Sequence, residues 1–483
     1  MINKVDSPQG IGKVGIAQTD ITPPIGIYHR MWGAAKHDQA TGVHRPLFLT
    51  VLYMESSEYA SEKFILITMD HCILDGAEIN AIRNLVATSC KINQSCVVVS
   101  LSHTHGSGWM SRTRSGLPGG EFVGPYLDGI IQQCASAAIT AMNSSQPAFV
   151  TFGSTRCNLA ANRDYFDETS KQFVCGFNPE GFADDTVLFA KIENTDGKCL
   201  ATLVNYACHP TTLAWENTKI SPDYIGAMRE IIEKETLAPC LFLQGASGDL
   251  GPKDGFVGDH KTADRNGMQL GFSVLSGLQS LAPPGKCFTY AGPVVSGATL
   301  GIWNYQPLQK EELNSKKLWK AKEFTVLLPY RVDLPTLEET KNQLLHWQKE
   351  EAKALTSGDK IKARDSRAMV EQMTRQITRL SSLSGTKTHP YTFLLTIWGD
   401  SLWVFLPGEL YQMFQINLRK RFPGHALIVA TLSNEWQPGY LPEASTYGYE
   451  IYQEKIATLA AGCLEILLET VTREFKNLIK NIK

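Results

Sequence analysis

The sequence predicts a mixed α/β fold, in which one large domain holds mixed β-sheets flanked by helices. Two patterns indicate it in the N-terminal part of the chain: short apolar runs bounded by Gly, Pro, Asn and Asp, and longer stretches with apolar residues three and four positions apart. Hydrophobic residues make up 43% of the 483 positions, as in ordinary globular proteins. The core can therefore be large.

The elements follow in chain order. The expected strands are apolar runs between turn-forming residues: Val14–Ile21, Phe64–Thr68, Val97–Leu101, Ala201–Tyr206 and Cys240–Leu243. Apolar side chains at helical spacing predict two helices among them, at Tyr126–Met142 and Tyr224–Glu235. Helices and strands thus alternate along this part of the chain.

A change of composition marks residues 306–384. The segment is rich in charged residues and spaced leucines, with helical spacing over Leu337–Leu355 and Lys360–Leu380. We interpret residues 306–384 as a helical insertion, a solvated pair of helices packed through a Leu and Met stripe. A coiled-coil partner site is the less favoured alternative.

The C-terminal part returns to strands. Two apolar runs, Tyr391–Trp398 and Ser401–Phe405, flank Gly399-Asp400, which predicts a β-hairpin. A helix is expected at Leu410–Arg421, and a final amphipathic helix at Glu450–Lys483, broken or bent near Gly462.

Composition excludes several classes of protein. The 46 basic and 48 acidic residues give a net charge of −2, which argues against a nucleic-acid binder. The longest apolar runs are far shorter than the ~18 residues that span a bilayer. The 11 Cys include no Cys-x-x-Cys pair and Met1–Gly10 resembles no signal peptide, so we expect reduced thiols and a cytoplasmic protein. Oligomeric state is left open.

Several predicted strands end in side chains that can bind a metal. His103 and His105 follow one strand, His209 another and Glu409 a third, while Asp249 lies in a Gly-rich loop after a fourth. Positions i and i+2 of a strand share a face, so the first two imidazoles can converge. Sites in α/β sheets gather beyond the carboxyl ends of strands, and three such ligands with one open position describe catalytic zinc. Core-packed histidines are the alternative.

Two other kinds of active site are excluded by pattern. Gly245-Ala246-Ser247-Gly248 lacks the final Gly of the Gly-x-Ser-x-Gly nucleophile elbow, because Asp249 stands there. The sequence also holds neither a P-loop nor a dinucleotide-binding fingerprint.

At this point the motifs resemble those of the neutral/alkaline ceramidase family, zinc-dependent enzymes that hydrolyse the amide of N-acylsphingosine. Their shared order carries the resemblance: Val14–Thr22, Ser102–His105, Asn162-Arg163, Asn205–His209, Ser221–Asp223, Gly248-Asp249, Pro407–Glu409 and Ser433-Asn434. The resemblance implies a single metal-hydrolase domain over residues 1–483. It does not extend to the family's immunoglobulin-like C-terminal domain.

The resemblance also implies the residues of the site. Its ligands for one zinc ion per chain are His103, His209, Glu409 and Tyr440. The residues that it places around the catalytic centre are His105, Arg163 and Tyr449, and Tyr447 competes with Tyr449 for that place. Iron, manganese and nickel also accept His and carboxylate ligands.

We therefore expect a zinc-dependent hydrolase that cleaves an amide (N-acyl) bond by metal-activated water. The family's proposed Ser nucleophile corresponds to Gly251, which has no reactive side chain, and the turn Gly106–Met110 differs from the family's. The expected substrate is a small N-acyl compound or lipid amide, such as a sphingolipid, that need not be ceramide. The alternatives are a non-catalytic, ligand-binding descendant and a metal-dependent esterase.

Overall fold

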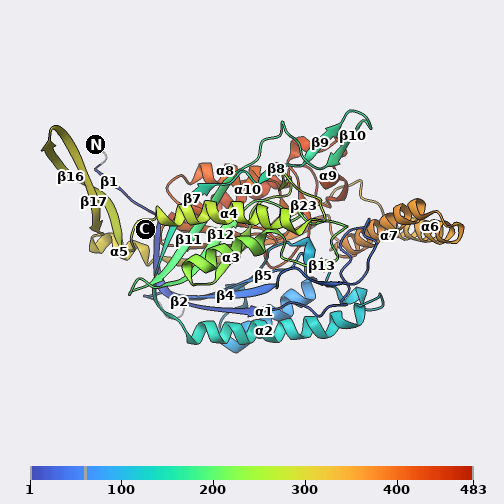
Figure 1. Cartoon of the computed structure of the whole chain (residues 1–483), viewed down its shortest axis with the longest axis horizontal. Helices are drawn as coiled ribbons and strands as arrows, with labels where there is room; N and C mark the ends of the chain where they lie inside the picture. The colour runs from blue at the N-terminus through green and yellow to red at the C-terminus, as the bar shows by residue number, and fades with distance from the viewer. Residues whose placement is uncertain (1–2, 59–61, 384, 481–483) are drawn as a thin grey trace.

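The computed structural model describes residues 3–58, 62–383 and 385–480, and it confirms the mixed α/β fold. Two sheets lie face to face, and helices cover the outer face of each, so the body has four layers (Figure 1). In the described part of the chain, no helix has the length and apolar character that crossing a membrane requires.

The larger sheet contains all five strands expected in the N-terminal part. Its order is β14 (Cys240–Gln244), β12 (Cys199–Tyr206), β11 (Thr186–Asn194), β7 (Gln146–Arg156), β2 (Gln9–Asp20), β4 (Phe48–Glu55), β5 (Lys63–Met69) and β6 (Val97–Leu101). The outermost pairs, β12 with β14 and β5 with β6, are parallel, and the inner pairs are antiparallel. Strand β14 also contacts β5 and β6, so the two ends of this sheet approach each other.

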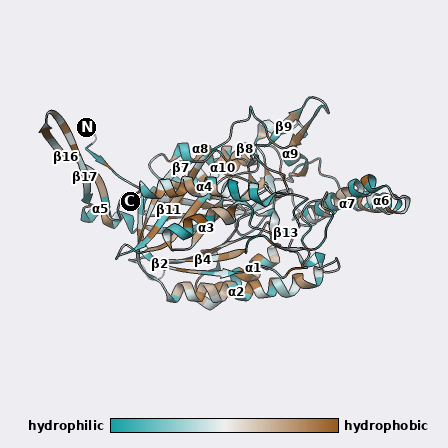
Figure 2. Cartoon of the chain, viewed as in Figure 1, coloured by the Kyte–Doolittle hydropathy of each residue, from teal (hydrophilic) through white to brown (hydrophobic). Residues whose placement is uncertain are grey.

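The smaller sheet contains the expected hairpin. Its order is β18 (Trp319–Pro329), β19 (Thr388–Trp398), β20 (Ser401–Phe405) and β22 (Ala426–Ala430). Trp403 packs between the sheets, whereas Val404 faces the outer helices, as alternation along a strand requires. The strands at the centre of the molecule are accordingly hydrophobic (Figure 2).

Helices close both outer faces. The larger sheet is covered by α1 (Gly76–Cys90), α2 (Val123–Asn143), α3 (Tyr224–Thr236) and α4 (His260–Gln279), and the smaller by α8 (Met413–Arg421) and α10 (Cys463–Lys480). Helix α2 lies very close to β2, because a Cβ at Gly15 would overlap the carbonyl oxygen of Ala141. The expected break at Gly462 is confirmed, and α10 follows the short α9 (Tyr452–Ile456).

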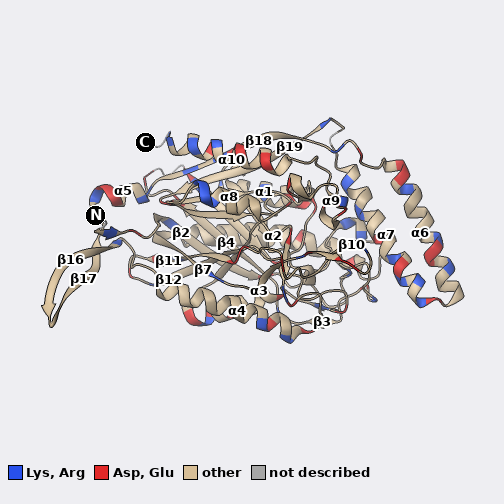
Figure 3. Cartoon of the chain, turned by 90° about the horizontal axis from the view of Figure 1, so that it is seen from above, with Lys and Arg blue, Asp and Glu red and all other residues tan. Residues whose placement is uncertain are grey.

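The two helices of the expected hairpin are confirmed, but they occupy only part of residues 306–384. Helices α6 (Leu337–Ser357) and α7 (Lys360–Ser381) project from the body and carry dense charge (Figure 3). The preceding residues hold only a short helix, α5 (Lys310–Lys316), before strand β18. Apolar and polar residues alternate over residues 319–322 of β18 and again, out of phase, over residues 323–326, which is interrupted strand periodicity within a highly charged segment. Ser384 lies outside the described residues.

Local signals set the ends of the two projecting helices. Thr336 and Glu339 form a capping box at the start of α6, and Gly358, with φ of +74°, ends it. Asp359 then accepts a hydrogen bond from the N–H of Lys362 and caps α7. At the opposite end of the molecule, β16 (Lys286–Ser296) and β17 (Ala298–Pro307) form a second projecting hairpin (Figure 1).

Candidate metal centre and adjoining cavity

Loops at the carboxyl ends of the strands bring the predicted ligands together. The Nε2 atoms of His103 and His209 lie 3.2 and 2.9 Å from the same oxygen, Oε2, of Glu409. The three side chains are at least nine-tenths buried. They follow β6, β12 and β20, so the site gathers where sequence position predicts it.

His103 and His105 converge through a turn and not through strand alternation. Strand β6 ends at Leu101, and His103 has φ of +66°, a left-handed conformation that non-glycine residues seldom adopt. His105 begins a 3₁₀ turn, which Thr104 caps through its side-chain oxygen. The two rings lie 5.0 Å apart between centroids. The prediction that they share a strand face is wrong, since the strand has already ended.

A two-residue strand pair places Tyr440 beside Glu409. Strand β21 (Glu409–Leu410) runs parallel to β23 (Tyr440–Leu441), with Glu409 opposite Tyr440. The Tyr440 hydroxyl lies 3.4 Å from His209 Nε2. Gly408 precedes this pair with φ of +78°, and a Cβ there would lie 2.5 Å from the carbonyl oxygen of Gly439. The pairing also explains why the helix expected from Leu410 begins at Met413.

The hydrogen bonds of the two histidines fit a metal site. Nδ1 of His103 lies 2.8 Å from the carbonyl oxygen of Cys72, and Nδ1 of His209 lies 2.7 Å from that of Ser247. Each Nδ1–H therefore donates to a carbonyl, which leaves the Nε2 lone pair free to bind a metal. Together with Glu409 these are three ligand atoms within 4.8 Å of one another. Three electron-pair donors this close require a cation, and their types suit zinc.

A proton takes the place of that cation when no metal is bound. Burial lowers the pKa of His209 to about 4. Burial also lowers the pKa of His103, but Cys72 and Glu409 outweigh it and hold that pKa well above its ordinary value. Burial raises the pKa of Glu409, but the neighbouring imidazoles keep it well below its usual range. Metal and proton thus compete for one position.

His105 and Arg163 also lie at this centre. Both ring nitrogens of His105 are buried and lack a hydrogen-bond partner among the described residues. Burial, with His103 and His209 nearby, holds its pKa well below the ordinary value, so its ring is neutral at pH 7. Arg163 donates to the Tyr440 hydroxyl at 3.0 Å and to the carbonyl of Gly248 at 2.7 Å.

The structure does not bring Tyr449 into the centre. Its side chain is 60% exposed and contacts Phe173, with ring centroids 6.1 Å apart. The competing Tyr447 donates its hydroxyl hydrogen to the carbonyl of Leu459 at 2.9 Å. Tyr452 lies here instead, with its ring 6.0 Å from that of Tyr440. The turn at Gly448, with φ of +93°, directs the chain so that α9 begins at Tyr452.

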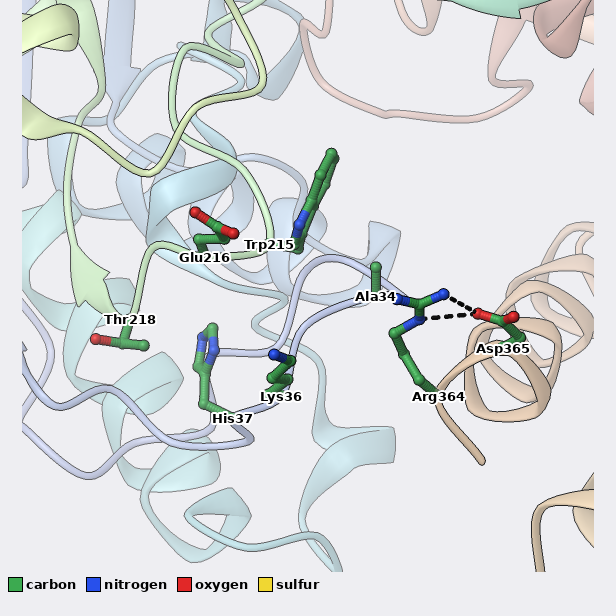
Figure 4. A pocket seen from close by; sticks show the side chains of 8 residues that line it. All are labelled: Ala34, Lys36, His37, Trp215, Glu216, Thr218, Arg364 and Asp365. Carbon is green, nitrogen blue, oxygen red and sulfur yellow. Dashed lines mark hydrogen bonds and ion pairs between the residues drawn. The ribbon is translucent and has the colours of Figure 1, made fainter. Parts of the chain in front are cut away.

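A cavity of about 500 Å³ adjoins the metal centre. Its lining includes three residues of the centre, His105, Arg163 and Tyr440, together with Tyr452. Residues that the sequence analysis missed form much of the remaining wall: Met31, Trp32, Thr211, Trp215, Phe256, Arg375 and Arg379. A second cavity, of about 740 Å³, shares Ala34 and Trp215 with the first and therefore adjoins it (Figure 4). Arg375 and Arg379 lie four residues apart on α7, so they share one face of the helix. This spacing is the sequence signal that could have identified them together.

Asp249 is expected to make the free energy of unfolding depend on pH. Its carboxylate accepts hydrogen bonds from the backbone N–H and side-chain amide of Gln412 at 2.8 and 2.7 Å, yet burial raises its pKa to about 7. The folded state therefore binds a proton that an unfolded chain, whose Asp titrates near pH ~4, releases. Stability accordingly falls as pH rises from about 4 to 7.

The variant Asp249→Asn removes this titration. Between pH values of about 4 and 7, its free energy of unfolding should fall less steeply with pH than that of the wild type. The two slopes should differ by up to about 1.4 kcal/mol per pH unit. Urea unfolding of zinc-free protein at several pH values measures the slope. A slope equal to that of the wild type would show that Asp249 does not hold this proton.

Comparison with known proteins agrees with the fold. Residues 13–252 match the family model described as neutral/alkaline non-lysosomal ceramidase, N-terminal. The crystal structure of neutral ceramidase from Pseudomonas aeruginosa is similar, with a TM-score of 0.62 and 13% identity, over 97% of this chain and 74% of that one. A structure described as ceramidase complexed with C2 has a TM-score of 0.63 and 14% identity, with the same coverage. No curated protein matches the sequence significantly.

Proposed function

Because residues 13–252 match the model of the neutral/alkaline ceramidase family, we propose that this chain is a zinc-dependent hydrolase that cleaves the amide bond of an N-acyl compound or lipid amide. One observation carries the proposal: His103, His209 and Glu409 converge on one point beside a cavity large enough for a small organic substrate. A zinc ion held there would supply Lewis acidity to the amide carbonyl and to a water molecule.

The neighbouring side chains have separate roles. His105 is neutral, and its ring nitrogens have no hydrogen-bond partner among the described residues, so it can take up a proton from the attacking water and return it to the leaving amine. The resemblance implies Tyr440 as a fourth ligand, but burial raises the pKa of its hydroxyl well above the ordinary value in the metal-free protein. We therefore assign it a different role, to donate a hydrogen bond to the developing oxyanion. Arg163 holds that hydroxyl in place.

Water is the nucleophile in this proposal, because position 251 has no side chain. A Cβ there would lie 3.7 Å from Arg163 Cδ and 3.8 Å from Thr211 Oγ1. The Thr211 hydroxyl is buried, lines the cavity and has no hydrogen-bond partner in the described part of the chain. It can therefore orient the substrate or the attacking water near the site of the missing Ser.

The variant His105→Ala is expected to keep its zinc and lose turnover. Removal of a general acid–base should lower kcat by about 10²–10⁴-fold with little change in KM. Zinc content and steady-state kinetics of the same preparation measure both. The matched control is His346→Ala, an exposed histidine of α6.

The same variant tests a second arrangement of ligands. Cys72, His103 and His105 also have ligand atoms within 4.8 Å of one another. Loss of zinc from His105→Ala would favour that group and contradict a role for His105 as proton carrier.

A substrate panel tests the reaction itself. Zinc-loaded protein is incubated with N-acyl amines, lipid amides and simple esters, and release of amine or alcohol is measured. Amide cleavage that a chelator abolishes is the expected result. Cleavage of esters alone would make the protein an esterase, and turnover of neither would favour a ligand-binding protein.

A further inference from the structure

One face of helix α7 forms a wall of the substrate cavity. Five of its residues line the cavity at helical spacing: Ala368, Glu371, Gln372, Arg375 and Arg379. The helical pair is therefore more than a solvated projection, because it adds charged side chains to the space beside the metal centre.

The charges of this cavity are predominantly positive. Its charged lining residues are Arg163, Glu371, Arg375 and Arg379. Glu371 is already neutralised, since its carboxylate lies 3.1 Å from Arg114 Nη1, and Arg163 binds the Tyr440 hydroxyl and a backbone carbonyl. The other two guanidinium groups, those of Arg375 and Arg379 on α7, have no anionic partner among the residues that the structure describes.

Arg379 is the more buried of the two. It is 8% exposed and donates one hydrogen bond, to Gln376 Oε1 at 2.9 Å. Arg375 donates to the carbonyl of Met31 and lies over the ring of Trp109, and its Nε is buried without a partner. In the described part of the chain, neither forms an ion pair with a carboxylate.

The two guanidinium groups in this cavity destabilise the folded protein unless an anion binds to them. A buried charge without a partner destabilises the folded state, and two like charges in one cavity add repulsion. Burial and Arg375 both lower the pKa of Arg379, which reflects this destabilisation. Guanidinium groups bind carboxylate and sulfonate through paired, charge-assisted hydrogen bonds, which would offset it.

We propose that the substrate is an anionic N-acyl compound, and that Arg375 and Arg379 bind its carboxylate or sulfonate while its amide lies at the metal centre. This inference rests on the proposed amide hydrolysis and names the substrate class. Met31, Trp32 and Phe256 line the same cavity and suit the apolar part of the acyl chain. A neutral lipid amide leaves both guanidinium groups uncompensated.

Three substrates of equal acyl length test the inference. N-decanoylglycine carries its carboxylate on the amine side, decanedioic acid monoethanolamide carries it on the acyl side, and N-decanoylethanolamine is neutral. The zinc-loaded wild type should have kcat/KM at least about 10-fold higher for one of the anionic substrates than for the neutral one. Which of the two is preferred identifies the side that bears the anion.

Substitutions assign the preference to the arginines. Arg375→Met and Arg379→Met should each lower kcat/KM for the preferred anionic substrate by about 10–100-fold, mainly through KM. The value for the neutral substrate should change less than about threefold. The matched control is Arg364→Met, on the same helix, whose guanidinium already pairs with Asp365 at 2.7 Å (Figure 4).

Other outcomes overturn the inference. It is wrong if the wild type hydrolyses the neutral substrate as well as both anionic ones, or if the Met variants lose activity equally on charged and neutral substrates. Should Arg379→Met not fold, Arg375→Met and Arg379→Lys carry the same comparison, with Lys expected to retain part of the preference.

Failure of the proposed function is distinguishable from failure of this inference. If none of the three substrates is hydrolysed, calorimetric titration of zinc-free protein with N-decanoylglycine, decanedioic acid monoethanolamide and N-decanoylethanolamine still measures the preference for an anion. Tighter binding of an anionic compound that Arg375→Met weakens would support the anion site without the reaction. Equal binding, or binding of none, would overturn it.

Discussion

The double variant His103→Ala, His209→Ala is expected to lose both its bound zinc and its amidase activity. Two of the three converging ligands disappear, and Glu409 alone cannot hold the ion at a catalytic site. Elemental mass spectrometry on protein purified without a metal-affinity tag should find about one zinc per wild-type chain and almost none in the variant. Activity should fall by at least about a thousandfold.

His346→Ala serves as the control for this experiment as well. It removes an exposed imidazole of α6, a helix that contributes no residue to the lining of the cavity. Circular dichroism shows whether each variant is folded. A folded wild type that holds no stoichiometric metal after zinc is supplied would contradict the hydrolase mechanism. The protein would then be better explained as a ligand-binding descendant of the family's fold.

Arg229→Met is expected to lower the free energy of unfolding more than the other substitutions proposed for this protein. The guanidinium of Arg229 on α3 donates two hydrogen bonds to the Asp70 carboxylate, at 2.6 and 2.9 Å, where both side chains are almost fully buried. Removal of the arginine leaves a buried carboxylate without its counterion, which costs about 3–5 kcal/mol. Urea unfolding measures the difference in free energy.

Two further variants show whether the buried charge is the cause. In Arg229→Met, Asp70→Asn the carboxylate is neutral, so the loss of stability should be smaller than in the single variant. Arg473→Met removes an exposed arginine of α10 that pairs with the adjacent Glu474, and should change stability by less than about 1 kcal/mol. A loss of less than about 1 kcal/mol in Arg229→Met would mean that water or a rearranged side chain compensates Asp70.

Local sequence patterns were sufficient to predict part of the fold. Apolar runs and helical spacing identified five strands of the larger sheet, helices α2 and α3, and the hairpin of β19 and β20, because these patterns depend on neighbouring residues. They did not identify β4, β7 and β11 of the same sheet. They were insufficient at β18, where alternation is hidden among many charges. Its strand state depends on pairing with β19.

The ligands could be predicted because each directly follows a strand. Strand ends can be recognised in a sequence, and sites in α/β folds gather beyond the carboxyl ends of strands. His103, His209 and Glu409 therefore appear as candidates before any contact between them is known. Tyr440 and Arg163 were predicted in a different way, from the order of motifs that the chain shares with the ceramidase family.

Tertiary structure alone decided how these residues meet and what surrounds them. The left-handed turn at His103 replaces the expected strand geometry, and α9 presents Tyr452 to the cavity while Tyr449 faces outward. Arg375 and Arg379 reach the cavity because one face of α7 forms part of its wall. Periodicity reports which face of an element is buried, whereas these contacts join residues that are far apart in the sequence, so only the packed chain determines them.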